Sequence, residues 1–429
     1  MVVGDGVWDG YLATEEVLRL IARGLEALPL DGRRVIVLIP DGTRTMPMPQ
    51  VFDTLERTLA PRTRALDYLV ALGTHPPMSD AQLSRLVGRT VADGFAGRAR
   101  IFNHQWDNPA ALIHLGSIPA REIAALTAGR LRQDVPVALN KLVVHYDHVL
   151  ICGPVFPHEV AGFSGGAKYL FPGIAAAPII HFTHWLGALM TNYAIVGTLH
   201  TPVRAVIDRA ASLLDCPVSL LAFVVTHEGT AGVFCGDVHE AWRRAAILSA
   251  RRHIVWVERP FDRVLSVMPP MYDDLWVAGK GMYKVEAVVA DGGEVIIFAP
   301  HVTDVSRVHG AIIEEIGYHC CDYFMTQWDR FSRFPGGILA HSTHVKGLGT
   351  FDVASGRETG RIAVSLATGL DAQRCARINL GFRDPAHIDP AEWPTTFDQR
   401  TLVVPRAGEL LFRVGSPPGS DEDSEVLQL

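Results

Sequence analysis

Residues 33–40 read RRVIVLIP, a short run rich in β-branched residues and closed by a proline. Such a run is typical of a buried strand. The preceding stretch, TEEVLRLIARGLEAL at 14–28, begins with a threonine and has apolar residues at helical spacing, which predicts a helix. Farther on, we expect a helix at 50–59, a strand at 66–72 and a helix at 80–87. This alternation predicts a mostly parallel sheet with helices on both faces.

The same alternation continues along the rest of the chain. We expect strands at 143–152 (broken near residue 147), 218–226, 264–269 and 294–300. We expect helices from about 175, from about 202, at 238–252 and at 275–290. The pattern is therefore that of an α/β protein.

The stretch ERPFD at 258–262 separates an earlier series of alternating strands and helices from a later one. We therefore place the main domain boundary there. The predicted fold has two domains of mostly parallel sheets flanked by helices, with the active site in the interdomain cleft. The N-terminal domain, 1–260, would carry the cofactor motifs. The C-terminal domain, 261–429, would complete the substrate pocket and end in a frayed tail from about residue 416.

Composition excludes several classes of protein. The 429 residues are 48% hydrophobic and 20% charged, which is enough for a large core. A net charge of −7 without a basic block argues against nucleic acid as a partner. The sequence shows no signal-peptide pattern and no run near the roughly eighteen apolar residues of a membrane span. With six cysteines and no CxxC, we expect reduced, mostly buried thiols in a cytoplasmic protein.

Two loops follow predicted strands, at the sheet edge where open α/β folds bind ligands. The first, DGTR, contains Asp41, Thr43 and Arg44, and its arginine would suit a carboxylate or a phosphate. The second, GTH, ends at His75, which is placed as a general acid or base would be. Taken alone, each loop fits an ordinary turn with a surface arginine or a structural histidine as well.

The third stretch, HEVAGFSGGAKY, begins at His158. Its glycine-rich loop contains Ser164, Gly165 and Gly166 and leads to Lys168. Glycines let backbone N–H groups approach an anion closely, and a helix N-terminus would reinforce this. The loop differs from a P-loop, because alanine precedes the lysine and tyrosine follows it. The sequence therefore disfavours a kinase or an ATPase.

Histidine pairs with a spacing of three residues occur at 145/148, 181/184 and 341/344. On a helix, this spacing can put both rings on one face, as a metal site requires. None of the pairs has the glutamate of an HExxH motif. A histidine-liganded zinc site is therefore possible but not specified.

Together, these segments resemble the lactate racemase family, the nickel-pincer-nucleotide racemases and epimerases of 2-hydroxy acids. The family pattern has an Asp-x-Thr-Arg loop, a Gly-Thr-His segment, a His-x-x-x-Gly-Phe-Ser-Gly-Gly-x-Lys core and a histidine sixteen residues after the lysine. Here they occur at 41–44, 73–75, 158–168 and His184. The third motif is long and matches at every point, and the resemblance covers roughly residues 5–410.

The resemblance implies how a cofactor would be held. Lys168 would carry the nickel-pincer nucleotide (pyridinium-3,5-bisthiocarboxylic acid mononucleotide nickel) covalently, through a thioamide bond. His184 would bind the nickel, whose other ligands are two sulfurs and a carbon of the cofactor. The remaining residues expected to contact the cofactor are Asp41, Thr43, Ser164, Gly165 and Gly166.

The resemblance also implies how substrate is handled. His75 and His158 would be the two acid/base residues on opposite sides of the substrate. Arg44 and Lys280 would hold its carboxylate, and Trp328 would close the pocket. The α-hydrogen of a 2-hydroxy acid is too weakly acidic for a histidine to abstract. Its transfer as hydride, while a histidine takes the hydroxyl proton, gives a 2-keto acid and avoids a carbanion.

One segment departs from the family pattern. The family stretch similar to Asp-Leu-Tyr-Gln-x-x-Lys appears at 274–280 as DLWVAGK, with Trp276 in place of tyrosine and Val277 in place of glutamine. Valine cannot hydrogen-bond a polar substituent, and an unpaired buried polar group is costly. We therefore expect a 2-hydroxy acid with an apolar side chain, lactate-like to bulkier, rather than malate or a sugar acid.

Two other functions stay open. One is a metal hydrolase that uses histidine-bound zinc and its water. The other is a non-catalytic binder of nucleotide-like anions that has kept the glycine loop. For the racemase, the expected partners are the small-molecule 2-hydroxy acid and the enzymes that build the cofactor, with neither nucleic acid nor membrane.

Overall fold

The computed structural model describes residues 1–393 and 400–417. Its internal contacts divide the chain into two compact units, each described separately here. Unit 1 comprises Met1–Phe156, Phe163–Ile180 and Pro202–Arg252, and unit 2 comprises Pro157–Gly162, His181–Thr201 and the chain from His253 onward. The last change of unit, after Arg252, lies near the expected boundary at 258–262. Two short segments of 1–260 belong to unit 2, so the single division at 260/261 stays a prediction. Of the tail expected to fray, residues 418–429 lie outside the described residues.

Unit 1 is built on an eight-stranded sheet with the order β1-β12-β11-β8-β2-β3-β5-β4. The five strands from β11 to β5 run parallel, whereas β1, β12 and β4 pair antiparallel at the two ends. The strands are Val2–Gly6 (β1), Arg34–Ile39 (β2), Ala65–Val70 (β3), Phe95–Ala96 (β4), Ala99–Asn103 (β5), His148–Pro154 (β8), Val218–Thr226 (β11) and Gly229–Asp237 (β12). In β2, all residues after the first are buried, as expected for a central strand.

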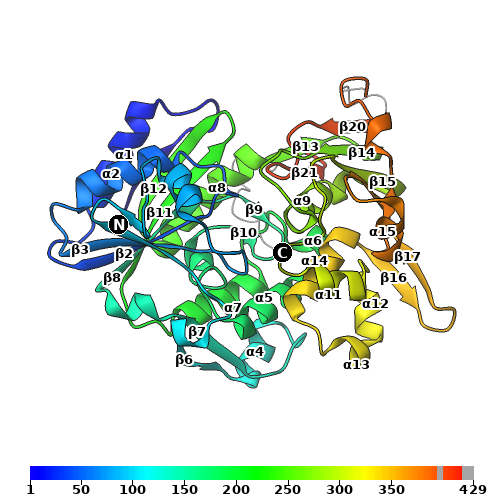
Figure 1. Ribbon diagram of the computed structural model, residues 1–429, viewed down its shortest axis with the longest axis horizontal. Helices are drawn as coiled ribbons and strands as arrows, with labels where there is room; N and C mark the ends of the chain where they lie inside the picture. Colours follow the sequence, from blue (N-terminus) through cyan, green and yellow to red (C-terminus); the bar gives the residue numbers. More distant parts are fainter. Residues whose placement is uncertain (394–399, 418–429) are drawn as a thin grey trace. The chain divides into compact units, whose positions relative to one another are not determined.

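Helices flank this sheet. They are Thr14–Glu26 (α1), Met48–Leu59 (α2), Asp80–Val87 (α3), Ala120–Leu126 (α4), Pro202–Ala211 (α7) and Val238–His253 (α8). Leu25 of α1 and Phe52 of α2 lie in one buried cluster with Val37 of β2 and Tyr68 of β3. Figure 1 shows α7 on the other side of the sheet from α1 and α2. The predicted α/β class with a mostly parallel, helix-flanked sheet is therefore confirmed.

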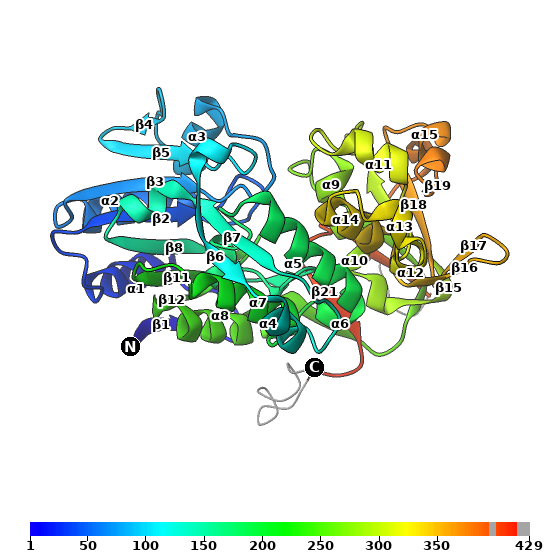
Figure 2. The same cartoon turned by 90° about the horizontal axis from the view of Figure 1, so that it is seen from below.

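Smaller elements complete unit 1. They are Pro109–Ala111 (η1), Leu112–Ile118 (β6), Val135–Asn140 (β7), Lys141–His145 (η2), Gly162–Phe163 (β10, which starts in unit 2) and Gly166–Tyr169 (η3). β6 and β7 form an antiparallel pair, which Figure 2 shows beside α4. The strand expected at 143–152 breaks at residue 147 as predicted, but its first part is the 3-10 helix η2.

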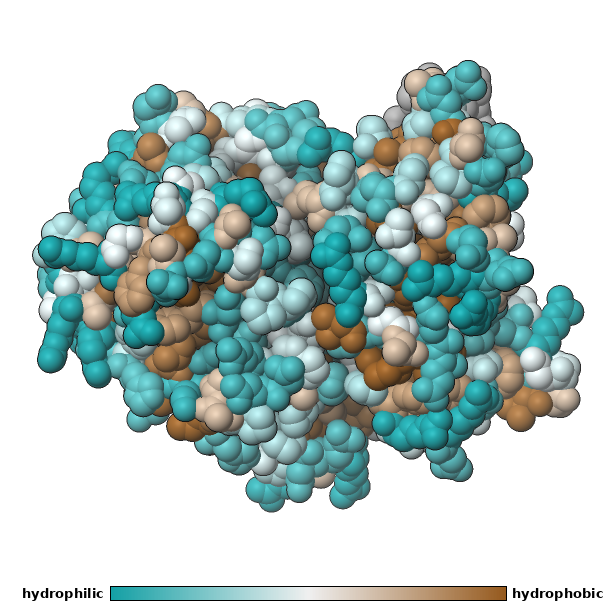
Figure 3. Space-filling model, viewed as in Figure 1, coloured by the Kyte–Doolittle hydropathy of each residue, from teal (hydrophilic) through white to brown (hydrophobic). Residues whose placement is uncertain are grey.

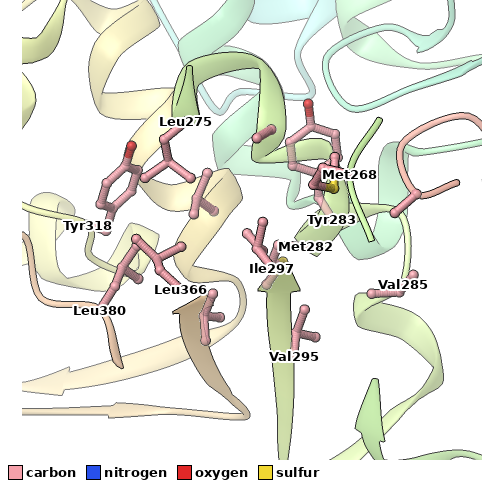
Figure 4. Packing of buried hydrophobic residues seen from close by; sticks show 14 of the residues in the cluster. Met268, Leu275, Met282, Tyr283, Val285, Val295, Ile297, Tyr318, Leu366 and Leu380 are labelled. Carbon is pink, nitrogen blue, oxygen red and sulfur yellow. The ribbon is translucent and has the colours of Figure 1, made fainter. Parts of the chain in front are cut away.

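Unit 2 contains a five-stranded sheet of the order β19-β18-β15-β14-β20, in which every neighbouring pair is parallel. Its strands are Phe261–Val267 (β14), Val289–Ala299 (β15), Ala363–Thr368 (β18), Gly381–Phe382 (β19) and Thr401–Val404 (β20). Figure 4 shows the core of this unit, where Val295 and Ile297 of β15 lie in one buried cluster with Met282 and Leu366.

The other elements of unit 2 lie around this sheet. They are Pro157–His158 (β9), Ala177–Met190 (α5, which starts in unit 1), Asn192–Ile195 (α6), Ile254–Val257 (β13), Leu275–Ala278 (α9), Lys280–Tyr283 (α10), Glu286–Val288 (η4), Gly310–Ile316 (α11), Cys321–Thr326 (α12), Trp328–Phe331 (α13), Gly336–Lys346 (α14), Gly349–Asp352 (β16), Arg357–Gly360 (β17), Ala372–Arg377 (α15), Pro385–His387 (η5) and Leu411–Val414 (β21).

One helix prediction in unit 2 is wrong. The helix expected at 275–290 is split into α9, α10 and η4, and Val289 already belongs to β15. The tandem β-branched residues at 288–289 continue into the strand, which has Val295 and Ile297 in the core. An apolar run of this length fits a helix and a strand equally well by periodicity, so only packing decided it.

The surface and the thiols agree with the composition. Figure 3 shows hydrophilic side chains over most of the visible face, with hydrophobic ones in scattered groups. All six cysteines are free, and four of them are buried. In the described part of the chain, no helix is both long and apolar enough to cross a membrane.

Candidate active site

The loops after β2 and β3 bring Asp41 and His75 together in unit 1. The two strands are parallel neighbours with Ile39 opposite Val70, so both loops leave the same edge of the sheet. Nδ1 of His75 lies 2.5 Å from Oδ2 of Asp41. A carboxylate can only accept, so this contact puts the ring proton on Nδ1 and leaves the lone pair on Nε2. His75 is thereby set up as a base.

The rest of the DGTR loop supports this carboxylate. The backbone N–H and the hydroxyl of Thr43 both donate to Oδ1 of Asp41, at 3.0 and 2.6 Å. Nη1 of Arg44 donates to the Thr43 hydroxyl oxygen at 2.6 Å. Burial by itself would raise the pKa of Asp41, but His75, Arg44 and Thr43 together hold that pKa well below its usual range. Asp41 is therefore a carboxylate at neutral pH, although its side chain is only 8% exposed.

The glycine-rich loop of unit 1 is held from several sides. The Ser164 hydroxyl donates to the Pro154 carbonyl and accepts from the Phe156 N–H. The Trp242 indole N–H donates to the Ser164 carbonyl at 2.8 Å, and Arg204 donates to the carbonyl of Gly165. The Ser164 hydroxyl is thus paired with two backbone groups of the protein. The predicted cofactor contacts of this loop stay predictions.

Sequence reasoning missed Arg204 and Trp242. Both come from helices that begin more than thirty residues after the loop, α7 and α8. Arg204 is only 4% exposed, and burial lowers its pKa to about 10. A single arginine in a helical pattern does not indicate that its side chain is buried and binds the glycine-rich loop, because most arginines lie on the surface.

Lys168 lies on η3, a 3-10 turn of four residues, and is partly exposed. The turn begins at Gly166, directly after Gly165, and these two glycines have φ values of 60° and 77°. The predicted reinforcement by a helix N-terminus is absent here, because one short turn has no macrodipole of consequence.

Unit 2 holds the other predicted acid/base residue, His158, at the end of β9, where it is 6% exposed. The ammonium of Lys284 donates to the carbonyl of the preceding residue, Pro157. Lys284 is itself only 1% exposed. The backbone that carries His158 is therefore anchored to the residue that follows α10.

The DLWVAGK segment forms α9 and the start of α10 in unit 2. Trp276 lies between two histidine rings, with centroids 4.5 Å from His309 and 4.1 Å from His341. Val277 is 8% exposed and belongs to the buried cluster of this unit. Nζ of Lys280 lies 4.6 Å from the centre of the Tyr272 ring, and this lysine is 9% exposed. The contacts of His309 and His341 with Trp276 could not be predicted from the sequence, since the three residues are far apart in the chain.

His184 and Trp328 are connected through one aromatic contact in unit 2. Trp185, the neighbour of His184 in α5, stacks on Trp328 with centroids 5.2 Å apart and planes 15° apart. Trp328 is 38% exposed. The structure therefore places the predicted closing tryptophan against the helix that carries the predicted nickel ligand.

Two of the three histidine pairs lie on helices, His181/His184 on α5 and His341/His344 on α14. His148 lies in β8 after a 3-10 turn, so the first pair has no common helix face. Among residues 1–393 and 400–417, no group of three or more His, Cys, Asp or Glu residues could hold a metal ion.

Comparisons with known proteins agree with these motifs. The family described as "Lactate racemase N-terminal domain" matches residues 13–196. The lactate racemases of Thermoanaerobacterium thermosaccharolyticum and Lactiplantibacillus plantarum are each 24% identical to the chain over 64% of its length. Residues 13–196 belong to this domain family. The alignment spans only 62% of each of these two relatives.

Solved structures show the same fold. A protein from Thermotoga maritima is 30% identical, with a TM-score of 0.86 over 94% of this chain and 99% of that one. The lactate racemase apoprotein from T. thermosaccharolyticum is 19% identical, with a TM-score of 0.68 over 94% and 93%. The segment matched by the family includes His75, His158, Lys168 and His184, whereas Lys280 lies beyond it.

Proposed function

We propose that this protein is a racemase or epimerase of 2-hydroxy acids. The observation that carries the proposal is the Asp41–His75 contact, joined to Thr43 and Arg44 in one hydrogen-bonded loop. It supplies a base and a carboxylate-binding cation at the ligand-binding edge of a parallel sheet. The curated relatives that carry the name lactate racemase support the same reaction type.

The residues present fit a nickel-pincer nucleotide by the chemistry of their donors. Such a group brings two sulfurs and a carbon to its nickel, so it needs one protein ligand and one amine. His184 on α5 would be the ligand, and Lys168 on η3 would be the point of covalent attachment. The bound group would supply acceptance and return of hydride at the α-carbon.

The chain's own residues would handle the carboxylate and the proton. Arg44 and Lys280 would bind the substrate carboxylate, which leaves the hydroxyl to a histidine. Nε2 of His75 would accept the hydroxyl proton for one enantiomer, and His158 would do so for the other. Two bases are needed because the α-hydrogen leaves from opposite faces in the two enantiomers.

The substrate would have an apolar side chain. Val277 offers no hydrogen bond, and Trp276 is held between two rings, so both favour an apolar substituent. Trp328 would cover the bound molecule. Kinetic comparison of lactate, 2-hydroxybutyrate and phenyllactate with malate and gluconate tests this point, and a preference for either of the last two would refute it.

The deciding experiment is mass spectrometry of the protein produced together with the cofactor-building enzymes. We expect an adduct on Lys168, bound nickel and racemised product from a single enantiomer. Lys168→Ala should lose the adduct, whereas Lys141→Ala, at an exposed lysine, should keep it. An unmodified chain that binds zinc and hydrolyses substrates would indicate the metal hydrolase, and anion binding without turnover would indicate the non-catalytic binder. In this proposal the protein works in the cytoplasm, as its free thiols allow.

A further inference from the structure

Two neighbours compete for one ring nitrogen of His158. The backbone N–H of Val160 donates to Nδ1 at 3.1 Å. Oε2 of Glu159 lies 3.4 Å from the same nitrogen. All three residues are consecutive and lie in unit 2. The protonation of Nδ1 therefore decides which neighbour His158 is paired with.

The two pairings have opposite consequences at the far side of the ring. A backbone N–H can only donate, so its hydrogen bond requires a bare Nδ1 and puts the proton of the neutral ring on Nε2. In that form, Nε2 cannot accept a proton. A carboxylate can only accept, so pairing with Glu159 requires a proton on Nδ1 and frees the lone pair of Nε2.

Glu159 has the charge that this second pairing needs. Burial would raise the pKa of Glu159, but a hydrogen bond from its own backbone N–H and the positive groups around it lower that pKa overall. These groups are Lys280 on α10, Lys284 directly after that helix and, when it is protonated, His344 on α14. The side chain of Glu159 is 17% exposed and that of His158 is 8% exposed, so water screens their interaction only partly.

We propose that Glu159 is the positioning residue of His158. It accepts a hydrogen bond from the protonated Nδ1 and so stabilises the two forms of His158 that exchange a proton at Nε2, the neutral base and the imidazolium. The Val160 N–H stabilises the resting tautomer, which cannot act as a base at Nε2. In turnover, the proton of the substrate hydroxyl would move to Nε2, while the Nδ1 proton stays against Glu159. This catalytic part of the inference rests on the proposed racemase function.

The arrangement differs from that at His75. There, Asp41 contacts Nδ1 directly at 2.5 Å, so the base form is already selected. At His158 the carboxylate is 3.4 Å away and a donor is bound to the same nitrogen. Removing the Glu159 charge should therefore impair proton transfer at His158 and leave His75 unaffected.

The first test is NMR of the full chain with isotope-labelled histidine, made without the cofactor-building enzymes. The Glu159→Gln variant keeps the shape of the side chain and removes its charge. We expect His158 to form its imidazolium about one pH unit lower than in the unchanged protein, as follows from loss of an opposite charge within about 4–6 Å. A His158→Gln variant assigns the signal.

The chain offers a matched control in the same unit. Nδ1 of His319 lies 2.7 Å from Oε2 of Glu358, which makes a second histidine–glutamate pair. Glu358→Gln should shift the His319 signals and leave those of His158 in place. If Glu159→Gln left the titration of His158 unchanged, the inference would be overturned.

The second test is kinetic and uses the cofactor-loaded protein. Glu159→Gln should lower kcat about 10- to 100-fold with KM changed less than about twofold, as expected for loss of general acid–base efficiency without loss of binding. Glu159→Asp restores the charge and should recover part of kcat. Equal kcat in Glu159→Gln and the unchanged enzyme would overturn the inference. Absence of racemisation in the unchanged, loaded protein would instead refute the proposed function, and the NMR result would still report the pairing.

Discussion

At the scale of the residue, the few lysines of the chain differ in their burial. Only five of the 39 basic residues are lysines. Lys141 is exposed, while Lys168, Lys280, Lys284 and Lys346 are partly or fully buried. Arginine supplies the surface charge of this protein, because it is always charged and binds carboxylates with two N–H groups.

Asp41 allows a prediction at this scale. Asp41→Asn keeps the shape of the side chain but replaces a carboxylate oxygen that accepts from His75. An amide can pair with the other tautomer of the ring, which has no lone pair on Nε2, so we expect kcat to fall roughly 100-fold or more. Cofactor content by mass, measured on the same sample, separates a loss of the base from a loss of the cofactor. Asp53→Asn, at an ion pair on α2, is the control and should keep full activity. Full activity in Asp41→Asn would show that His75 does not depend on this contact.

Val277 allows a second prediction. Val277→Gln would place an amide at a position that is 8% exposed within an apolar cluster. We expect the free energy of unfolding to fall by about 1–3 kcal/mol, because the amide loses its water without a prepared partner. If the side chain also faces the substrate, kcat/KM for malate relative to lactate should rise. Denaturant unfolding and competition kinetics measure the two effects separately. Val345→Gln, elsewhere in the same cluster, should cost stability without the change in preference.

At the scale of the element, the glycine loop between β10 and η3 depends on helices that contact it from outside. Trp242 of α8 and Arg204 of α7 bind its carbonyls, and Trp242 also leaves little space for a side chain at Gly166. A Cβ there would lie 3.0 Å from the indole of Trp242. The loop that leads to Lys168 is therefore shaped by its packing as well as by its own glycines.

Gly166→Ala tests this packing. It adds backbone strain at a φ of 60° and a close contact with Trp242, so we expect a loss of about 2–3 kcal/mol in the free energy of unfolding and less modified Lys168. The matched control is Gly32→Ala, with a φ of 68° and open space around the new methyl group. The control carries the strain alone, about 1–2 kcal/mol. Equal losses in thermal or denaturant unfolding would show that the tryptophan contact contributes nothing.

At the scale of the whole molecule, buried histidines make folding sensitive to acid. Burial lowers the pKa of His104 and of His148 from near 6.5 to about 4, although a hydrogen bond to the Ala175 carbonyl opposes this shift at His104. Both residues are at most 4% exposed. The folded protein therefore keeps these rings neutral at pH values where the unfolded chain binds protons.

The sign of the pH effect follows from these shifts. Above about pH 6.5 both rings are neutral in either state, and their contribution to stability is complete. As the pH falls from 6.5 to 4, the unfolded chain gains protons that the folded protein does not, so stability should fall, by on the order of 2–3 kcal/mol for each ring. Urea unfolding at several pH values measures this slope. His104→Gln should flatten it, and the exposed His114→Gln should not.

The sequence was sufficient for the α/β class, for most helices and strands of the N-terminal half and for the motifs of the lactate racemase family. These features are local, because residues such as those of RRVIVLIP or HEVAGFSGGAK specify their conformation through spacing and composition. The local sequence does not determine where the helix expected at 275–290 ends. The same apolar residues fit a helix and a strand, and packing in the core of unit 2 selects one. The pairings of the candidate site also depend on folding. Asp41 is 34 residues from His75, and Arg204 is 39 from Gly165. The chain by itself determined which chemical groups are present, whereas the tertiary structure decided which nitrogen of each histidine meets a carboxylate, because hydrogen bonds act only between groups that folding brings within about 3 Å.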